Sequence, residues 1–222
     1  MDIELKNAQL LVSRICHDLA GGISALSTGA ELLGDEGGVA DSNALDLIAA
    51  SALQSTRRLQ FLRVAFGQGG GDSQGGDAAI AMATLRDLTH GLLEGGRVSL
   101  VWADREAGVG DRLPLGAGKL LLNLCLIGSE TLPRGGVLDV SAVNVEGRLG
   151  FAVIARGEGA RLVDDLHQAI SLNVAGQNLT PRTVHGHFSA VLAAQLGAEL
   201  EIQVDEGQEV RFAALLPVLD TP

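Results

Sequence analysis

Cysteine is scarce in this chain of 222 residues, which contains only Cys16 and Cys125. The two lie far apart in the sequence, form no CxxC pair and have no nearby set of metal ligands, so neither redox catalysis nor a metal site is indicated. The N-terminal segment MDIELKNAQL also lacks the basic and apolar regions of a secretory signal peptide. We therefore expect a protein of the reducing cytoplasm.

Basic side chains and long apolar runs are also few. The 16 lysines and arginines are outnumbered by 27 acidic residues, which gives a formal net charge of -11. Phosphate binding needs clustered cations, so this balance argues against a nucleic-acid surface and favours a protein partner. No uninterrupted apolar run reaches the roughly 18 residues of a transmembrane helix, so we expect no membrane span.

The organisation of the chain is marked by one Gly-rich, polar segment. With 46% hydrophobic residues the sequence can build a sizeable core. The stretch GQGGGDSQGG, residues 67–76, has the composition of a flexible linker. We therefore predict two domains, 1–66 and 77–222. In the first, apolar periodicity predicts helices over about 3–33 and 42–66, joined by a Gly- and Asp-containing turn as a helical hairpin.

Beyond the linker, helical and strand patterns alternate. Segments such as VLDVSAVNV and AELEIQV show period-two alternation and are joined by short Gly turns. They predict a mixed or antiparallel sheet covered by helices, so the whole chain is predicted to be an α+β protein. The predicted helices span 78–93, 115–131, 162–171 and 181–196, and the predicted strands span 97–103, 137–145, 149–155, 198–204 and 208–216.

The segment SRICHDLAGG, residues 13–22, places an ionisable histidine, His17, and two glycines inside the first predicted helix. Projected at about 100° per residue, His17 points away from a continuous apolar stripe that we expect to be buried. The surface around His17 is made of small side chains, apart from Arg14, and this leaves room for a partner to approach one imidazole nitrogen. An ordinary surface histidine is the alternative. The stripe consists of Leu5, Ala8, Leu11, Val12, Ile15, Leu19, Ile23, Leu26, Ala30 and Leu33, and the predicted docking surface consists of Ser13, Ala20, Gly21, Ser24 and Thr28.

The predicted hairpin is too small to bury its apolar surface alone, because each amphipathic helix covers only one neighbour. Pairing two hairpins removes this difficulty. We therefore predict a homodimer in which two hairpins form a four-helix bundle with His17 on its outside. The second helix offers a heptad-like row for this purpose, formed by Leu45, Ile48, Ala52, Leu59, Leu62 and Phe66.

The sequence HDLAGGISALSTGAELL, which begins at His17, resembles the phosphoacceptor helix of histidine kinases, where an acidic residue and a leucine also follow the histidine. It is more similar to the ChpT-type histidine phosphotransferases of alphaproteobacteria, and this similarity covers almost the whole chain. One departure is Gly22, which stands where kinases usually have proline. The resemblance implies a homodimer that relays a phosphoryl group between receiver domains of a hybrid kinase and of response regulators.

The positions of single residues on the first helix predict their roles in this transfer. His17 would attack an aspartyl phosphate and form a phosphohistidine, and the chain would need no cofactor because Mg²⁺ comes with the partner's receiver domain. Asp18 would orient the imidazole, and a solvated helix acid is the alternative. Arg14 would meet the phosphoryl group or an acid on the receiver, and an ordinary surface charge is the alternative.

The C-terminal domain resembles a kinase ATP-binding domain, an α/β sandwich of the Bergerat type, that has lost its nucleotide contacts. In KLLLNLCLIGSETLPRGG, Asn123 matches the first asparagine of the kinase helix, but Ile127 takes the place of the metal-binding asparagine. In IARGEGA, Gly157 and Gly159 remain, but Ala155 replaces the adenine-binding aspartate. We therefore expect no ATP binding. An active ATP-dependent kinase and a non-catalytic scaffold that binds receivers are the alternative functions.

The remaining histidines and the cysteines are predicted to be structural. His185 and His187 are two residues apart but lack a third metal ligand, so a satisfied or exposed pair is expected. His90 and His167 are predicted to lie at helix surfaces or caps. Cys16 is expected to be a buried, inert thiol on the packed side of its helix.

Overall fold

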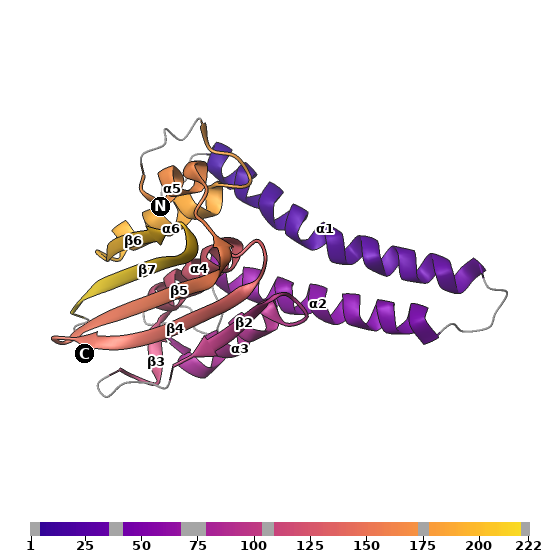
Figure 1. Cartoon of the computed structure of the whole chain (residues 1–222), viewed down its shortest axis with the longest axis horizontal. Helices are drawn as coiled ribbons and strands as arrows, with labels where there is room; N and C mark the ends of the chain where they lie inside the picture. The colour runs from indigo at the N-terminus through magenta and orange to yellow at the C-terminus, as the bar shows by residue number, and fades with distance from the viewer. Residues whose placement is uncertain (1–4, 36–41, 68–78, 104–108, 173–177, 219–222) are drawn as a thin grey trace.

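The computed structural model describes residues 5–35, 42–67, 79–103, 109–172 and 178–218. Two long helices project from a second part in which further helices cover a sheet (Figure 1). The mixed α+β class predicted from the sequence is therefore confirmed. The predicted linker, apart from Gly67, lies outside the described residues, so the division into two domains stays a prediction.

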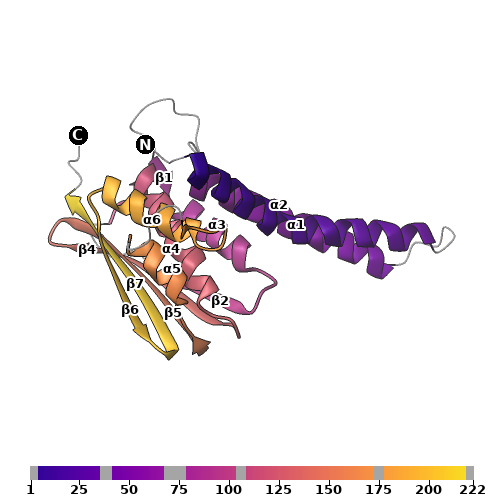
Figure 2. The same ribbon diagram turned by 90° about the horizontal axis from the view of Figure 1, so that it is seen from above.

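The two projecting helices are α1 (Leu5–Asp35) and α2 (Ser42–Phe66), and they lie side by side over most of their length (Figures 1 and 2). Their bounds agree with the two helices predicted from apolar periodicity. The helices approach closely at Gly29, where a Cβ atom would lie 2.6 Å from Cγ1 of Ile48. Glycine at this position therefore sets the distance between the two helices.

The apolar stripe of α1 is not buried along its whole width, which corrects the prediction. Ile15 and Leu19 pack against the core, but Val12 and Ile23 are 60% and 56% exposed. The reason is geometric, since α2 covers only one side of an apolar arc that is wider than one neighbouring helix. The chain therefore leaves an apolar strip of α1 facing solvent.

The sheet of the second part has the strand order β2-β4-β5-β7-β6. Strands β2 and β4 are parallel and the other neighbours are antiparallel, so the predicted mixed sheet is confirmed. One row of facing residues, Leu138, Ala155 and Val210, is fully buried beneath the helices. The strands are β2 (Val98–Trp102), β4 (Gly136–Val145), β5 (Arg148–Ala160), β6 (Glu199–Asp205) and β7 (Gly207–Val218).

A second, two-stranded sheet was not predicted. Strand β1 (Ala79–Ala81) pairs antiparallel with β3 (Arg112–Pro114). Three residues are too few to show an alternating pattern, so the sequence gives no signal for either strand. The helix predicted from residue 78 begins only at Met82 because Ala79–Ala81 are held in extended conformation by this pairing.

The described helices that follow α2 lie on one side of the five-stranded sheet (Figure 2). They are α3 (Met82–Leu93), α4 (Leu115–Glu130), α5 (Asp164–Ile170) and α6 (Val184–Gln195). Helix α4 is apolar nearly all round, which is typical of a helix with no face toward solvent. It is enclosed by the sheet and by α2, α3 and α6. Leu120, Leu124 and Ile127 are fully buried on it.

Helices α1 and α2 contact the second part at separate places. α1 touches α6, and the C-terminal end of α2 packs on α3 and α4. Phe61 and Leu62 of α2 belong to the same hydrophobic core as α4. The amide of Asn123 on α4 donates a hydrogen bond of 3.0 Å to the carbonyl oxygen of Ala65. These contacts fix the position of α1 and its histidine relative to α4 and α6.

Across the residues that the structure describes, no helix combines the length and the apolarity needed to cross a membrane.

Candidate functional site

His17 lies near the middle of α1 with its side chain 82% exposed. The residues predicted to form the docking surface share this exposure. Within their own helix, the Ser13 hydroxyl donates a hydrogen bond of 2.9 Å to the carbonyl oxygen of Gln9. Ser13, Ala20, Gly21, Ser24 and Thr28 are all exposed. The imidazole therefore stands on an accessible surface of small side chains.

The two glycines that follow His17 have different surroundings. A Cβ atom on Gly21 would have no neighbour within 4 Å, whereas one on Gly22 would lie 2.1 Å from Oγ of Ser55 on α2. Gly22 therefore allows α1 and α2 to approach closely, and only Gly21 belongs to the open surface beside His17.

Asp18 is turned inward beside His17, with only 11% of its side chain exposed. Its Oδ1 atom lies 3.4 Å from Nδ1 of His17, and its Oδ2 atom accepts a hydrogen bond of 2.8 Å from Nε of Arg14. The carboxylate thus bridges a buried cation and the exposed imidazole. The alternative of a solvated helix acid is wrong.

Arg14 also points inward, which corrects the expectation of a cation facing a partner or solvent. Its side chain is 12% exposed and its Nη2 atom donates to Oε1 of Glu130 at the end of α4. Burial by itself lowers the pKa of the Arg14 guanidinium, but the charges of Glu130 and Asp18 outweigh burial and raise it. Arg14 is therefore a fixed charge that joins α1 to α4.

Glu130 and His185 complete this cluster. Oε2 of Glu130 lies 3.0 Å from Nε2 of His185, and Nδ1 of His185 lies 3.5 Å from Nη1 of Arg14. The first two atoms lie at ion-pair distance, although Nε2 of His185 makes no hydrogen bond. Burial alone raises the pKa of Glu130, but His185 and Arg14 outweigh it and hold that pKa below its usual value.

Sequence reasoning missed the role of Glu130 and of His185. His185 is fully buried, and its Nε2 atom makes no hydrogen bond, so the expectation of a satisfied or exposed histidine is wrong for this residue. Its polar contacts come from a cluster rather than from a neighbour in sequence. The three partners come from α1, α4 and α6, and no spacing rule links residues that lie so far apart in the sequence. The one available signal was a charged residue, Glu130, ending the apolar helix LGAGKLLLNLCLIGSE.

The positions compared with a kinase ATP site are occupied by packed residues. Both Nδ2 hydrogen bonds of Asn123 go to backbone carbonyls, those of Ala65 and Lys119. Asn123, Ile127 and Ala155 are all fully buried. A Cβ on Gly157 would lie 2.4 Å from the carbonyl oxygen of Gly135, so this glycine permits two backbone segments to meet. These residues serve packing in the structure.

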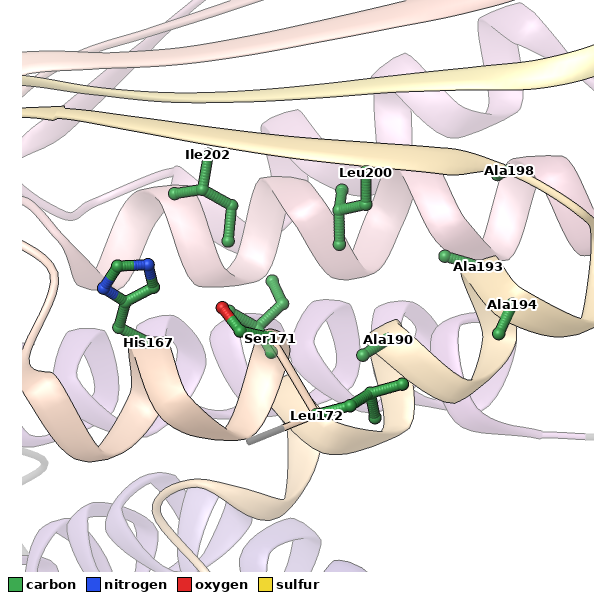
Figure 3. A pocket seen from close by; sticks show the side chains of 10 residues that line it. His167, Ser171, Leu172, Ala190, Ala193, Ala194, Ala198, Leu200 and Ile202 are labelled. Atoms are coloured by element: carbon green, nitrogen blue, oxygen red, sulfur yellow. The ribbon is translucent and has the colours of Figure 1, made fainter. Parts of the chain in front are cut away.

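A cavity of about 370 Å³ lies elsewhere, between α5, α6 and strand β6 (Figure 3). Alanines on α6 and directly before β6 leave space that larger side chains would fill. Polar side chains are contributed by His167 and Ser171 at the rim. The lining is formed by His167, Ile170, Ser171, Leu172, Ala190, Ala193, Ala194, Ala198, Leu200 and Ile202. This cavity lies apart from His17 and its inward-facing neighbours.

The other cysteines and histidines are mostly where the sequence indicated. His90 and His167 are exposed on α3 and α5, and Cys125 is buried. Cys16, by contrast, is exposed, because it lies on the side of α1 that α2 does not cover. Within the described ranges, no group of three or more His, Cys, Asp and Glu side chains could hold a metal ion.

Comparison with known proteins connects this geometry to a family. Residues 82–208 match the family described as "Histidine phosphotransferase C-terminal domain". The protein phosphotransferase ChpT of Brucella abortus (strain 2308) is 31% identical over 205 residues, which cover 92% of this chain and 93% of that protein. A solved bacterial phosphotransferase is 28% identical, with a TM-score of 0.81 and coverage of 96% of this chain and 98% of that chain.

The likeness extends to kinases at the level of the fold alone. The histidine kinase AdeS of Acinetobacter baumannii has a TM-score of 0.50 at 10% identity, over 91% of this chain and 98% of that chain. Because the phosphotransferase family match covers more than half of the sequence and the Brucella relative nearly all of it, the chain belongs to the histidine phosphotransferase family. It is a phosphotransferase rather than an ATP-dependent kinase.

Proposed function

We propose that His17 accepts a phosphoryl group from an aspartyl phosphate on one receiver domain and passes it to an aspartate on another. The observation that carries the proposal is an exposed imidazole beside an inward-held carboxylate. Asp18 Oδ1 lies 3.4 Å from Nδ1 of His17, which leaves Nε2 available for attack. Asp18 orients the ring, and Arg14 acts by holding Asp18.

The transfer follows from this arrangement. The lone pair of Nε2 forms a bond to phosphorus while the bond between phosphorus and the aspartyl oxygen breaks, and the aspartate leaves as a carboxylate. The proton on Nδ1 stays on the ring, where the Asp18 carboxylate stabilises the resulting positive charge. In the second half-reaction the carboxylate of another receiver attacks phosphorus, and neutral His17 is regenerated. Mg²⁺ belongs to the receiver domain in both steps.

The receiver domains of a hybrid kinase and of response regulators dock, in this proposal, over Ser13, Ala20, Gly21, Ser24 and Thr28. Small side chains on both sides of His17 support it, because reacting atoms must come within about 3.5 Å of each other. Larger side chains would keep the receiver's active site away from the imidazole.

A second copy of the chain completes a four-helix bundle, in our proposal, by covering the apolar strip that α2 leaves open. Val12 and Ile23 of α1 and Leu45 and Leu59 of α2 are exposed. Exposed apolar side chains on both helices favour association over exposure to water. Light scattering at micromolar concentration is expected to give the mass of two chains, and the mass of one chain would contradict the homodimer.

We also propose that the C-terminal α/β domain, residues 77–222, is a degenerate ATP-binding domain without a nucleotide or other cofactor. Its support is the use of Asn123, Ile127 and Ala155 in packing, since none of them is accessible to a ligand. The helices of residues 1–66 form the phosphotransfer domain, with 67–76 as the linker, and the reducing cytoplasm is the proposed location.

A relay experiment tests the function. The purified chain is mixed with a ³²P-phosphorylated receiver domain, separated, and then mixed with an unphosphorylated receiver. Acid-labile phosphate on the chain, and its later passage to the second receiver, are the expected results. Labelling from Mg-ATP alone would indicate a kinase, and binding of the receiver without uptake of phosphate would indicate a scaffold.

A further inference from the structure

Five polar side chains form one connected path from the surface to the core. His17 contacts Asp18, Asp18 accepts from Arg14, and Arg14 donates to Glu130. Glu130 contacts the fully buried His185, which also lies 3.5 Å from Arg14. The last three residues thus form a closed triangle that joins α1, α4 and α6.

Stability alone does not account for this triangle. Charged groups lose hydration when they are buried, and well-packed apolar side chains often replace a buried ion pair without loss of stability. The neighbouring core is rich in leucine, including Leu62 and Leu126 beside Arg14 and Glu130. A polar triangle in such surroundings is explained better by the geometry that it imposes on the groups attached to it.

The path constrains each group in turn. Arg14 makes its contacts with Glu130 and His185 through Nη1 and Nη2, which leaves Nε to donate to Asp18. Because Nε fixes Oδ2 of Asp18, the other oxygen, Oδ1, is held toward Nδ1 of His17. An Arg14 side chain without its two inner partners would be free to change rotamer and carry the carboxylate with it.

We propose that Glu130 and His185 are positioning residues for phosphotransfer: through Arg14 and Asp18 they hold the His17 imidazole with its proton on Nδ1 and its lone pair on Nε2. This inference rests on the proposed role of His17 as the phosphoacceptor. It assigns a function in the reaction to α4 and α6, which come from the part of the chain that resembles an ATP-binding domain. The contact between α1 and that part is then required for full reactivity of the histidine.

Phosphoramidate tests the proposal without a receiver, because this small donor reports the reactivity of the imidazole and not docking. Nε2 forms a bond to phosphorus, the P–N bond of phosphoramidate breaks and ammonia leaves. We expect Glu130→Gln and His185→Gln to slow this reaction on the order of tenfold. The matched control is Glu94→Gln, which removes an inter-helix ion pair with Arg57 that does not lead to His17.

A second readout is the protonation of the ring, measured from the ¹⁵N shifts of the two His17 nitrogens. The parent chain is expected to hold the proton mainly on Nδ1, and both variants are expected to shift it toward a mixture. Thermal unfolding of all variants is measured alongside. Glu130→Gln and Glu94→Gln are expected to lose the same stability, and only Glu130→Gln is expected to react more slowly. This result would show that Glu130 affects the position of His17 and not the folding of the chain.

The outcomes separate this inference from the proposed function. If His17→Ala reacts as fast as the parent, His17 is not the phosphoacceptor and the proposed function fails. If His17→Ala is inert but Glu130→Gln and His185→Gln react at the parental rate with unchanged ¹⁵N shifts, only the positioning role is overturned. A His17 proton found mainly on Nε2 in the parent chain also overturns the positioning role. This measurement needs no variant, so it decides the question even if both variants fail to fold.

Discussion

Gly29 of α1 lies so close to Ile48 of α2 that a Cβ atom on residue 29 would be 2.6 Å from Cγ1 of the isoleucine. Gly21, two turns earlier, has no neighbour within 4 Å of the same position. The two glycines therefore differ in what they allow, although both stand in the interior of one helix. Gly29 sets the helix spacing, and Gly21 leaves the surface beside His17 open.

Alanine at these two positions is expected to have opposite effects on the free energy of unfolding. Gly29→Ala forces Ile48 or α2 to move and should destabilise the chain by about 1–3 kcal/mol. Gly21→Ala meets nothing and should stabilise it by up to about 1 kcal/mol, since alanine is the better helix former. Urea unfolding measures both, and equal effects would contradict the close packing at Gly29.

Leucine beside His17 is expected to slow phosphotransfer from a receiver without weakening the fold. Gly21→Leu and Ser24→Leu improve helix propensity by up to about 1 kcal/mol. They also place bulk where a receiver must come close, so transfer should slow at least about tenfold. Ala83→Leu, at an exposed position of α3, is the control. Parental transfer rates in both variants would mean that receivers dock elsewhere.

The buried thiol of Cys125 is expected to be unreactive in the native chain. Burial raises its pKa to about 12, far more than the hydrogen bond with Thr89 lowers it. At pH 8 only about one such thiol in ten thousand is ionised. In a Cys16→Ser variant, a disulfide reagent should therefore label no thiol until urea unfolds the chain. Labelling of the native variant within minutes would contradict the packing around α4.

Acid is expected to weaken the contact between α1 and α4. The pKa of Glu130 is lower in the folded chain, because His185 and Arg14 outweigh the opposite effect of burial. A carboxyl group of this kind stabilises the fold above its unfolded pKa of about 4.3 and loses that contribution as the pH falls through the folded value.

The test compares the parent with Glu130→Gln, whose amide does not titrate. Between about pH 6 and pH 3, the free energy of unfolding should fall more steeply in the parent than in the variant. Urea titrations at stepped pH measure the difference. Parallel curves for the two proteins would show that Glu130 has no lowered pKa and that its contacts with Arg14 and His185 are absent in solution.

Much of the fold could be predicted because its elements carry long, regular patterns. The helices α1 and α2 are amphipathic over many turns, and α4 is an uninterrupted apolar segment. Strands such as β4 and β6 alternate in burial as their sequences do. Strands β1 and β3 were not predicted because three residues are too few to show an alternating pattern of apolar and polar side chains.

The site was predictable only where it depends on one helix. The exposure of His17 follows from its place opposite the apolar stripe, and this needs no knowledge of other elements. The inward turn of Arg14 depends on Glu130 and His185, which the fold brings to it from distant segments. The exposure of Cys16 was misjudged for a related reason, since the sequence alone does not tell which part of a wide apolar arc the neighbouring helix covers.

The measurement closest to the central claim is the position of the phosphoryl group after transfer. Chain labelled with ¹⁵N-histidine is reacted with a phosphorylated receiver domain and Mg²⁺, and the ³¹P–¹⁵N coupling identifies the bonded nitrogen. One phosphohistidine is expected, bonded through Nε2 of His17, together with its complete loss in a folded His17→Ala variant. Phosphate on Nδ1 of His17, on another residue, or retained in His17→Ala would contradict the claim.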